Sequence, residues 1–261
     1  MTRIGVHHMS ALNSTPADFI KMAADAGSDS VSIFTFGDSR RFPLVNQDNL
    51  AAVKTALKDS GLTVANIDAF SIGPDTKIAD LLPALDLGVE LGAQAVSAQI
   101  LGSDLSQMME KLGQLCELSL ERGFKVGLEF LPFTSLCRNL AETIELIKAL
   151  NCANLGMSMD ILHLIRSGGT ADDVAALSPD LICFAQVCDS QRLDATHDYM
   201  MEAVNGRLVP GKGKLPLQAF VAALPTDITI DIEIPNSAAG DPFERIKKAL
   251  QATQFLVYKP C

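Results

Sequence analysis

Apolar residues along the chain gather into short, nearly continuous runs. Eight of these runs stand out, and each contains few polar positions. Runs of this kind are typical of strands in a parallel sheet that is covered on both faces. We therefore expect one buried strand in each of RIGVHH, SVSIFTF, LTVANID, AVSAQI, KVGLEF, LGMSMD, LICFAQV and ITIDIEI.

The segments between the runs carry helical patterns. Residues Thr15 to Gly27 begin with a Thr-Pro pair and stop at glycine, and these residue types favour the start and the end of a helix. Residues Asn46 to Gly61 repeat apolar side chains at helical spacing, and Leu105 to Gly123 again stop at glycine. Strand followed by helix, eight times, predicts an α/β fold, a single (β/α)₈ TIM barrel.

The length of the chain agrees with this fold. Its 261 residues suit one such barrel, which typically needs about 250 residues. We expect a single domain over residues 1–261. The alternative is an open doubly wound sheet, which usually carries a glycine-rich phosphate turn after its first strand. The segment GVHHMSALNS contains no such turn, so the barrel is preferred.

Four late runs end on side chains that offer oxygen atoms. In a barrel, the carboxyl ends of the strands meet at one mouth, where enzymes of this fold keep their chemistry. A single acid after a strand is usually a helix cap or a solvated loop residue, but four in succession predict a divalent-metal site. Three carboxylates and one amide favour Mn²⁺, with Mg²⁺ or Co²⁺ next, over Zn²⁺. The four residues are Glu129, Asp160, Gln186 and Glu233.

The composition of the chain limits the classes of partner that we expect it to bind. The net charge is −10, and the chain has no stripe of Lys and Arg, so a nucleic-acid backbone would be repelled. No apolar run approaches the ~20 residues that cross a bilayer, and the opening MTRIGVHHMS lacks the apolar segment of a signal peptide. The six cysteines form no CxxC pair, so we expect reduced thiols. A cytoplasmic protein that acts on a small molecule, without nucleic-acid or membrane partners, is expected.

Histidines and arginines supply further candidates. His7 and His8 end the first run, and because side chains alternate along a strand only one of them can face the barrel interior. We expect that one to be His8. The long stretch from Cys188 to Lys214 is expected to form a lid or clamp over the mouth. It holds Arg192 and Arg207, whose guanidinium groups could bind a carboxylate or phosphate of the substrate.

These residues resemble the xylose isomerase-like TIM-barrel superfamily, which contains sugar phosphate isomerases and epimerases, hydroxypyruvate isomerase and 3-dehydroshikimate dehydratase. The resemblance covers nearly the whole chain and is strongest in LEFLP, MDILH, AQVCD, RLVPGKG and IEIP. It implies that His163 and Arg192 contact the substrate and that Arg207 belongs to a loop motif frequent in the family. Barrels of this group often form dimers or tetramers, so a homo-oligomer is compatible with it. The metal ligands that it implies are Glu129, Asp160, Gln186 and Glu233.

The resemblance also implies a mechanism. In ketose epimerases two matching glutamates move a proton on opposite faces of the substrate carbon. Transferred to this chain, the catalytic bases are Glu129 and Glu233, while the metal stabilises the enediolate. Two positions depart from that pattern, because Gln186 replaces the histidine of many epimerases and Ser135 replaces their second glutamate. The segment FLPFT is also more apolar than a pocket for a polyhydroxylated sugar requires.

We therefore expect a metal-dependent isomerase or epimerase of a small hydroxy-carbonyl compound. One alternative is a metal-dependent dehydratase of a cyclic keto-acid such as 3-dehydroshikimate. A second is a non-catalytic binding barrel, in which the fold survives while the site has decayed. A metal-dependent aldolase or another lyase is a third. Metal titration separates the binding barrel from the enzymes.

Overall fold

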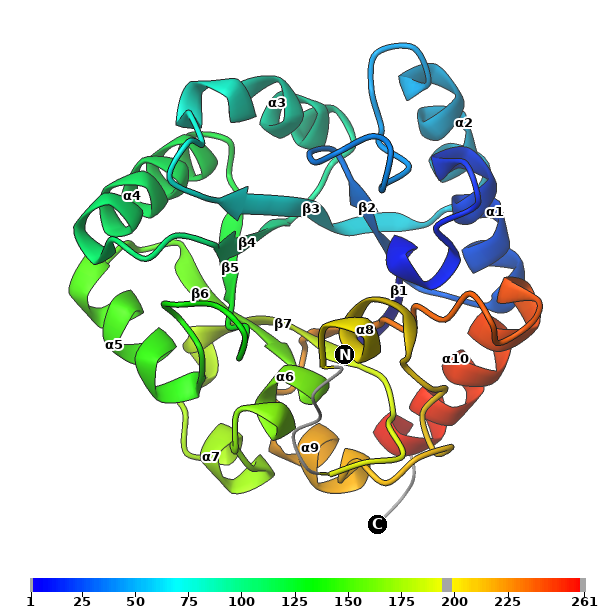
Figure 1. The fold of residues 1–261 in the computed structure, drawn as a ribbon. Helices are drawn as coiled ribbons and strands as arrows, with labels where there is room; N and C mark the ends of the chain where they lie inside the picture. Colours follow the sequence, from blue (N-terminus) through cyan, green and yellow to red (C-terminus); the bar gives the residue numbers. More distant parts are fainter. Residues whose placement is uncertain (1, 194–198, 259–261) are drawn as a thin grey trace.

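The computed structural model describes residues 2–193 and 199–258 and contains a closed parallel barrel (Figure 1). Strands follow one another in chain order, and the last strand pairs with the first. The predicted (β/α)₈ barrel is therefore confirmed. Its strands are β1 (Arg3–His7), β2 (Ser30–Phe34), β3 (Thr63–Ile72), β4 (Ala95–Ile100), β5 (Lys125–Glu129), β6 (Leu155–Asp160), β7 (Ile182–Val187) and β8 (Thr229–Ile232).

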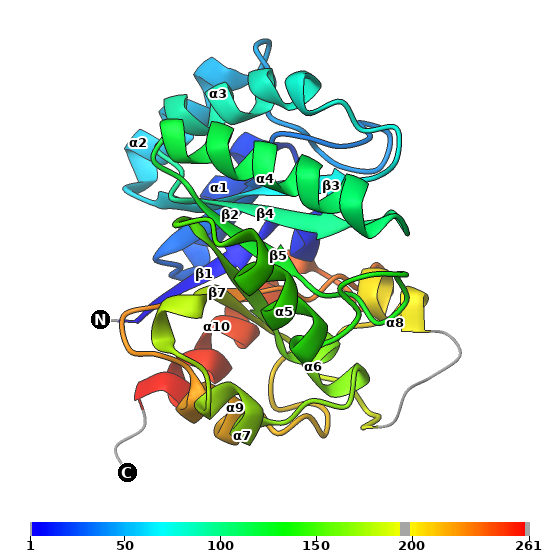
Figure 2. The same cartoon turned by 90° about the vertical axis from the view of Figure 1, so that its left-hand side faces the viewer.

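Helices surround the barrel and cover the outer face of its strands (Figures 1 and 2). The strands are consequently buried on both faces, as their continuous apolar runs require. The α-helices are α1 (Pro16–Ala26), α2 (Leu50–Ser60), α3 (Leu82–Glu90), α4 (Leu105–Glu121), α5 (Leu140–Leu150), α6 (Ile161–Arg166), α7 (Ala171–Ala175), α8 (Tyr199–Asn205), α9 (Leu217–Ala223) and α10 (Pro242–Tyr258). Short 3₁₀ helices are η1 (His8–Ala11), η2 (Ile78–Leu81) and η3 (Pro179–Leu181).

Helix ends follow the chemistry read from the sequence. Helix α1 begins after Thr15, whose hydroxyl accepts a hydrogen bond from the backbone N–H of Asp18 at 3.2 Å. It ends at Gly27, which has a φ of 93°, a left-handed conformation that glycine adopts without steric cost. Helix α2 starts at Leu50, later than expected, because Asn46 and Asn49 bond each other's backbone in a turn before it.

Helix α8 differs from the other helices in position. It lies at the carboxyl end of the barrel, inside the ring of helices (Figures 1 and 2). It belongs to the long segment between β7 and β8, where a lid was expected. Later in that segment, the Asp189 carboxylate accepts hydrogen bonds from the backbone N–H groups of Gly211, Gly213 and Leu215. Asp189 thus orders the PGKG loop.

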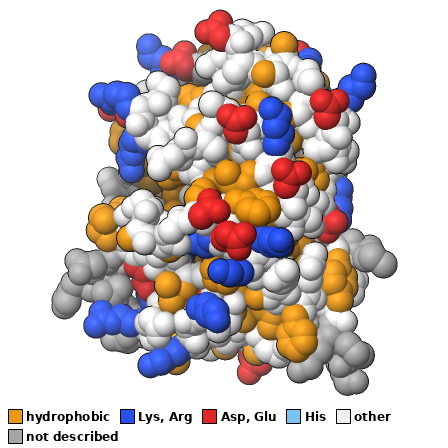
Figure 3. Space-filling model, turned by 90° about the vertical axis from the view of Figure 1, so that its right-hand side faces the viewer, with side chains coloured by type: hydrophobic (Ala, Val, Ile, Leu, Met, Phe, Trp, Pro, Cys, Tyr) orange, Lys and Arg blue, Asp and Glu red, His pale blue; other side chains and the backbone are white. Residues whose placement is uncertain are grey.

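The surface carries both signs of charge. On the side of the barrel drawn in Figure 3, acidic and basic side chains are interspersed among small apolar areas. The face therefore has no stripe of one charge. Among the helices of the described residues, none is both long and apolar enough to span a bilayer.

Candidate active site

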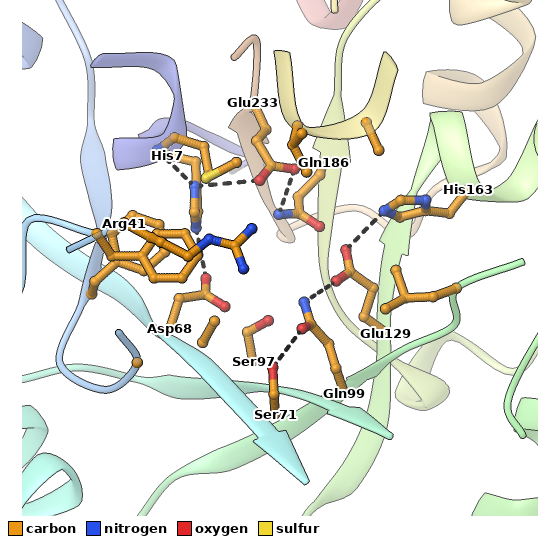
Figure 4. A pocket seen from close by; sticks show the side chains of 18 of the residues that line it. His7, Arg41, Asp68, Ser71, Ser97, Gln99, Glu129, His163, Gln186 and Glu233 are labelled. Carbon is orange, nitrogen blue, oxygen red and sulfur yellow. Dashed lines mark hydrogen bonds and ion pairs between the residues drawn. The ribbon is translucent and has the colours of Figure 1, made fainter. Parts of the chain in front are cut away.

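The four predicted ligands converge at the mouth of the barrel. Glu129 and Asp160 are the last residues of β5 and β6, Gln186 lies near the end of β7, and Glu233 directly follows β8. All four side chains are buried. Three of them, Glu129, Gln186 and Glu233, line one cavity of about 420 Å³ (Figure 4). The prediction that these strand ends come together is confirmed.

A group of possible metal ligands lies beside this cavity. Glu129, Asp160 and His163 offer ligand atoms that all lie within 4.8 Å of one another. His163 stands on the first turn of α6, so it joins as a possible ligand, whereas the sequence resemblance implied a substrate contact. Gln186 is the partner of Asp160 across β6 and β7, and its Nε2 donates to Glu233 Oε2 at 3.2 Å, so both residues adjoin the group. Buried carboxylates with a nearby imidazole and amide fit a divalent cation.

Arg207 lies among these carboxylates and is buried with them. Its Nη1 forms ion pairs with Asp160 and, at 3.0 Å, with Oε2 of Glu233. Its Nε donates to the carbonyl of Ala203 in α8 at 2.8 Å, which fixes the direction of the guanidinium. Arg207 was expected to bind an anionic substrate or order its loop. The structure places its positive charge between two predicted metal ligands, in the lining of the cavity, and its role in substrate binding stays a prediction.

Electrostatics in the site reflect crowding of negative charge. Burial, then Glu233 and Asp160, raise the pKa of Glu129 well above its ordinary value. Burial also raises the pKa of Glu233, although Arg207 opposes it. For Asp160, burial alone would raise the pKa, but Arg207 and His163 outweigh it and the pKa is lowered. One guanidinium does not balance these carboxylates, so the site favours an additional cation.

His7, rather than His8, faces the cavity. The His7 ring contacts Asp68 Oδ2 at 2.7 Å and Glu233 Oε1 at 3.5 Å. His8 is buried outside the cavity lining and stacks on Phe19 with ring centroids 4.2 Å apart. The expected placement of His8 was wrong because β1 ends at His7, and His8 already belongs to η1, where strand alternation no longer applies.

Two residues of the early strands were missed by the sequence analysis. Asp68 of β3 holds His7, and Gln99 of β4 donates from Nε2 to Glu129 Oε2 at 2.5 Å. Ser71 in turn donates to Gln99 Oε1 at 3.0 Å (Figure 4). Both runs, LTVANID and AVSAQI, carry a polar side chain at or near the end. The signal used for the late strands would have found them.

Arg192 does not line the cavity. It is exposed, next to residues 194–198, which the structure does not describe. Its backbone carbonyl accepts a hydrogen bond from Arg166 Nη2 at 3.1 Å. The guanidinium that does line the cavity outside the carboxylate cluster belongs to Arg41, in the loop between β2 and α2. The expected role of Arg192 in substrate binding stays a prediction.

One wall of the cavity is aromatic and apolar. Phe34 and Phe42 stack with ring centroids 4.6 Å apart, and the Arg41 guanidinium lies over the Phe42 ring at 5.7 Å. Gly37 makes room for Phe42, because a Cβ on Gly37 would lie 3.0 Å from that ring. Other apolar residues of the lining include Met9, Phe36, Leu101, Leu131, Phe133 and Met200.

Helix α8 covers part of the cavity and is bound to its neighbours by polar contacts. Met200, Ala203 and Val204 line the cavity from this helix. Arg166 of α6 donates to both carboxylate oxygens of Glu202, at 2.7 and 2.8 Å. The Tyr199 hydroxyl contacts the His163 ring, and burial lowers the pKa of His163 to about 4. The helix is therefore connected directly to the candidate metal ligands.

Comparison with known proteins identifies the family of this chain. The sequence profile of the xylose isomerase-like TIM barrel matches residues 20–256. The chain belongs to the xylose isomerase-like TIM barrel family. The 3-dehydroshikimate dehydratase of Pseudomonas aeruginosa is 26% identical over 225 residues, which cover 81% of this chain and 34% of that protein. The chain thus spans about a third of the length of this curated relative.

Two solved structures share the fold. The IolI protein, determined with a bound zinc atom, has a TM-score of 0.81 and 17% identity, with 98% of both chains covered. D-psicose 3-epimerase, determined in the presence of D-fructose, has a TM-score of 0.74 and 15% identity, with 98% of this chain and 99% of that chain covered. At these identities the similarity establishes the fold alone.

Proposed function

We propose that this chain is an enzyme that isomerises or epimerises a small hydroxy-carbonyl compound by moving a proton on the carbon next to the carbonyl. One observation supports this best: Glu129 and Glu233 face the same cavity, the first at the end of β5 and the second after β8. Carboxylates on separate sides of a substrate can remove a proton and return one. The surrounding aromatic wall limits access of water to that carbon.

Neighbouring side chains orient the two proposed bases. Gln99 donates to Oε2 of Glu129, and Ser71 fixes Gln99 in turn. His7 contacts Oε1 of Glu233 while Asp68 holds the other ring nitrogen. Each carboxylate is therefore fixed by a chain of two polar side chains. Preorganisation of this kind keeps a base within reach of the proton that it removes.

A divalent cation completes the proposal. Glu129, Asp160 and His163 would hold it, with Gln186 and Glu233 as neighbouring ligands. When bound, the cation supplies positive charge that stabilises negative charge developing on the substrate oxygens. Manganese is our first choice, with magnesium or cobalt next, because most of the donors are carboxylates.

A second candidate reaction is dehydration of a cyclic keto-acid. Two observations favour it: the cavity has an aromatic wall, and the curated relative is a 3-dehydroshikimate dehydratase. The same proton abstraction would start this reaction, but loss of water would follow. Glu129 and Glu233 would keep their roles as base and acid.

Proton exchange tests the proposal directly. Elemental analysis of the purified protein comes first, followed by incubation of the Mn²⁺-loaded protein in D₂O with ketoses, hydroxypyruvate and 3-dehydroshikimate. Deuterium entering the carbon next to the carbonyl, read by NMR, is the expected result, and the product separates isomerase from dehydratase. Absence of bound metal after Mn²⁺ loading, together with absence of exchange, would favour a non-catalytic binding barrel instead.

A further inference from the structure

The Arg41 side chain stands apart from the other cations of the cavity. Among the described residues that line the cavity, Arg207 is paired with Asp160 and Glu233, and His7 with Asp68. Arg41 lies within salt-bridge distance of no carboxylate in the described part of the chain, and its guanidinium lies over the Phe42 ring at 5.7 Å. Its charge is therefore open to a ligand.

Arg40, the residue before Arg41, explains why Arg41 does not form an ion pair with Asp38. Asp38 also lines the cavity, and its carboxylate would compete for Arg41. Arg40 occupies that carboxylate through two parallel hydrogen bonds, Nε to Oδ1 at 2.9 Å and Nη2 to Oδ2 at 2.8 Å. The fork of Arg40 matches the geometry of the carboxylate, so both oxygens of Asp38 are engaged in this solvent-exposed pair. The loop thus has one arginine, Arg40, that holds Asp38 by direct hydrogen bonds, and a second, Arg41, that acts on Asp38 only through its charge and lines the cavity.

Arg41 and Glu129 lie on opposite sides of the cavity. Glu129 and His163 lie on one side, and Arg41 lies on the other, where the nearby Asp68 carboxylate is paired with His7 (Figure 4). A ligand with an anionic end would be repelled by the carboxylate side and attracted by Arg41. Beside Arg41, the wall contains phenylalanine rings of β2 and the loop after it, Phe34, Phe36 and Phe42. Flat apolar surface suits a ring and offers few partners for a row of hydroxyl groups.

We propose that Arg41 binds the carboxylate of a small cyclic acid whose ring packs on the phenylalanine wall. This orientation places the opposite edge of the ring at Glu129 and Glu233. The inference rests on the proposed function only in assuming that the substrate occupies this cavity. It deepens that function, because it makes a carboxylate the recognised group and Arg41 the residue that selects it. The cavity, at about 420 Å³, falls within the range of small-molecule sites, ~300–1,000 Å³.

Binding of simple probes tests this assignment without requiring turnover. Benzoate carries a ring and a carboxylate, and benzamide has the same shape without the charge. We expect the wild-type protein to bind benzoate more tightly than benzamide in calorimetric titrations. Arg41→Gln should weaken benzoate binding by about 10- to 100-fold, the size of a charge-assisted hydrogen bond pair, and leave benzamide unchanged. Arg41→Lys should recover part of the loss, because lysine keeps the charge without the fork.

A matched control is Arg138→Gln. Arg138 is exposed, pairs with Glu142 and does not line the cavity, so this variant makes the same change in net charge elsewhere. Benzoate binding should be unaffected. An equal loss in Arg138→Gln, unchanged benzoate binding in Arg41→Gln, or a loss that appears only in Arg192→Gln would each overturn the proposal. So would a wild-type protein that binds neither probe, or that binds benzamide as tightly as benzoate.

Phenyl phosphate distinguishes a carboxylate from a phosphate ligand. A dianionic phosphate calls for more donors than one guanidinium provides, so it should bind no more tightly than benzoate. Much tighter binding of phenyl phosphate would overturn the choice of a carboxylate. Failure of this proposal is separable from failure of the proposed function. Deuterium exchange into neutral ketoses that does not depend on Arg41 would support the proposed enzyme but not the carboxylate site. Benzoate binding that depends on Arg41, without deuterium exchange, would support the carboxylate site but not the proposed enzyme.

Discussion

Arg207 brings positive charge to two carboxylates that would also bind a metal ion. Replacing it with methionine should leave Asp160 and Glu233 buried without their partner. Breaking a buried ion pair in this way costs about 3–5 kcal/mol of unfolding free energy. A divalent cation would replace the lost charge, so Mn²⁺ should raise the melting temperature of Arg207→Met more than that of the wild type.

Arg245→Met is the control for this comparison. Arg245 is also buried, but its Nη2 donates to the carbonyl of Ser10 and not to a carboxylate of the site. Its replacement should destabilise the protein while the shift caused by Mn²⁺ stays at the wild-type value. A shift in Arg207→Met no larger than in the wild type would show that Arg207 does not compete with the cation.

We expect Glu233 to be required for proton transfer. Glu233→Gln keeps the shape of the side chain but removes its capacity to accept a proton. Loss of a general base lowers kcat by about 10²- to 10⁴-fold. For any compound into which the wild-type protein exchanges deuterium, the exchange rate should fall by that amount while metal still binds. Glu244→Gln, an exposed residue of α10, should exchange at the wild-type rate. Unchanged kcat in Glu233→Gln with metal bound would remove Glu233 from the mechanism.

Which of these residues a sequence can reveal depends on how they are positioned. Glu129 and Asp160 end regular strands, so strand counting placed them at the mouth. His8 was preferred to His7 because the sequence does not mark where the strand ends, and strand alternation does not extend into the 3₁₀ helix that begins at His8. Arg41 lies in a loop whose path is set by Gly37 and the Phe42 ring, contacts that no local pattern encodes.

At the level of elements, the contacts that hold α8 in place should also affect the cavity that this helix lines. Arg166→Met should release its contact with Glu202 and loosen the helix. Because Glu202 is partly exposed and can turn to water, the expected loss of unfolding free energy is about 1–3 kcal/mol. Since α8 lines the cavity, KM should rise more than kcat falls. Replacing both partners with apolar residues should restore part of the stability. Additive losses in urea titrations would mean that the pair does not act as a unit.

The elements themselves were largely predictable, with informative exceptions. All eight runs became strands, because burial on both faces demands continuous apolar sequence. Strand β3 extends to Ile72, beyond the predicted run, because Phe70 to Ile72 pair with β4 after a shift in register. Helix α8 has only Tyr199 to Asn205 and is held by the ion pair between Arg166 and Glu202 and by the contact of Tyr199 with His163, so hydrophobic periodicity does not signal it.

The whole molecule should show opposing pH effects from two adjacent histidines. Burial, then the charge of His7, lower the pKa of His8 to about 3. The unfolded chain therefore binds the extra proton first, and stability is lost as pH falls from about 6.5 towards 3. For His7, burial opposes protonation, but Glu233 and Asp68 outweigh it and raise the pKa to about 9. That contribution is present below about 6.5 and is lost as pH rises through 9.

Stability measured against pH separates the two histidines. In protein treated with a chelator, the difference curve between wild type and His8→Gln should slope by about 1.4 kcal/mol per pH unit, only on the acidic side. The difference curve for His7→Gln should slope on the alkaline side, up to about pH 9. Difference curves are needed because carboxylates such as Asp160 also titrate in acid. Because His7 contacts Glu233, saturating Mn²⁺ should change the His7 curve and leave the His8 curve intact. If both curves responded alike to Mn²⁺, the two histidines could not occupy the separate environments that distinguish the cavity from the core behind it.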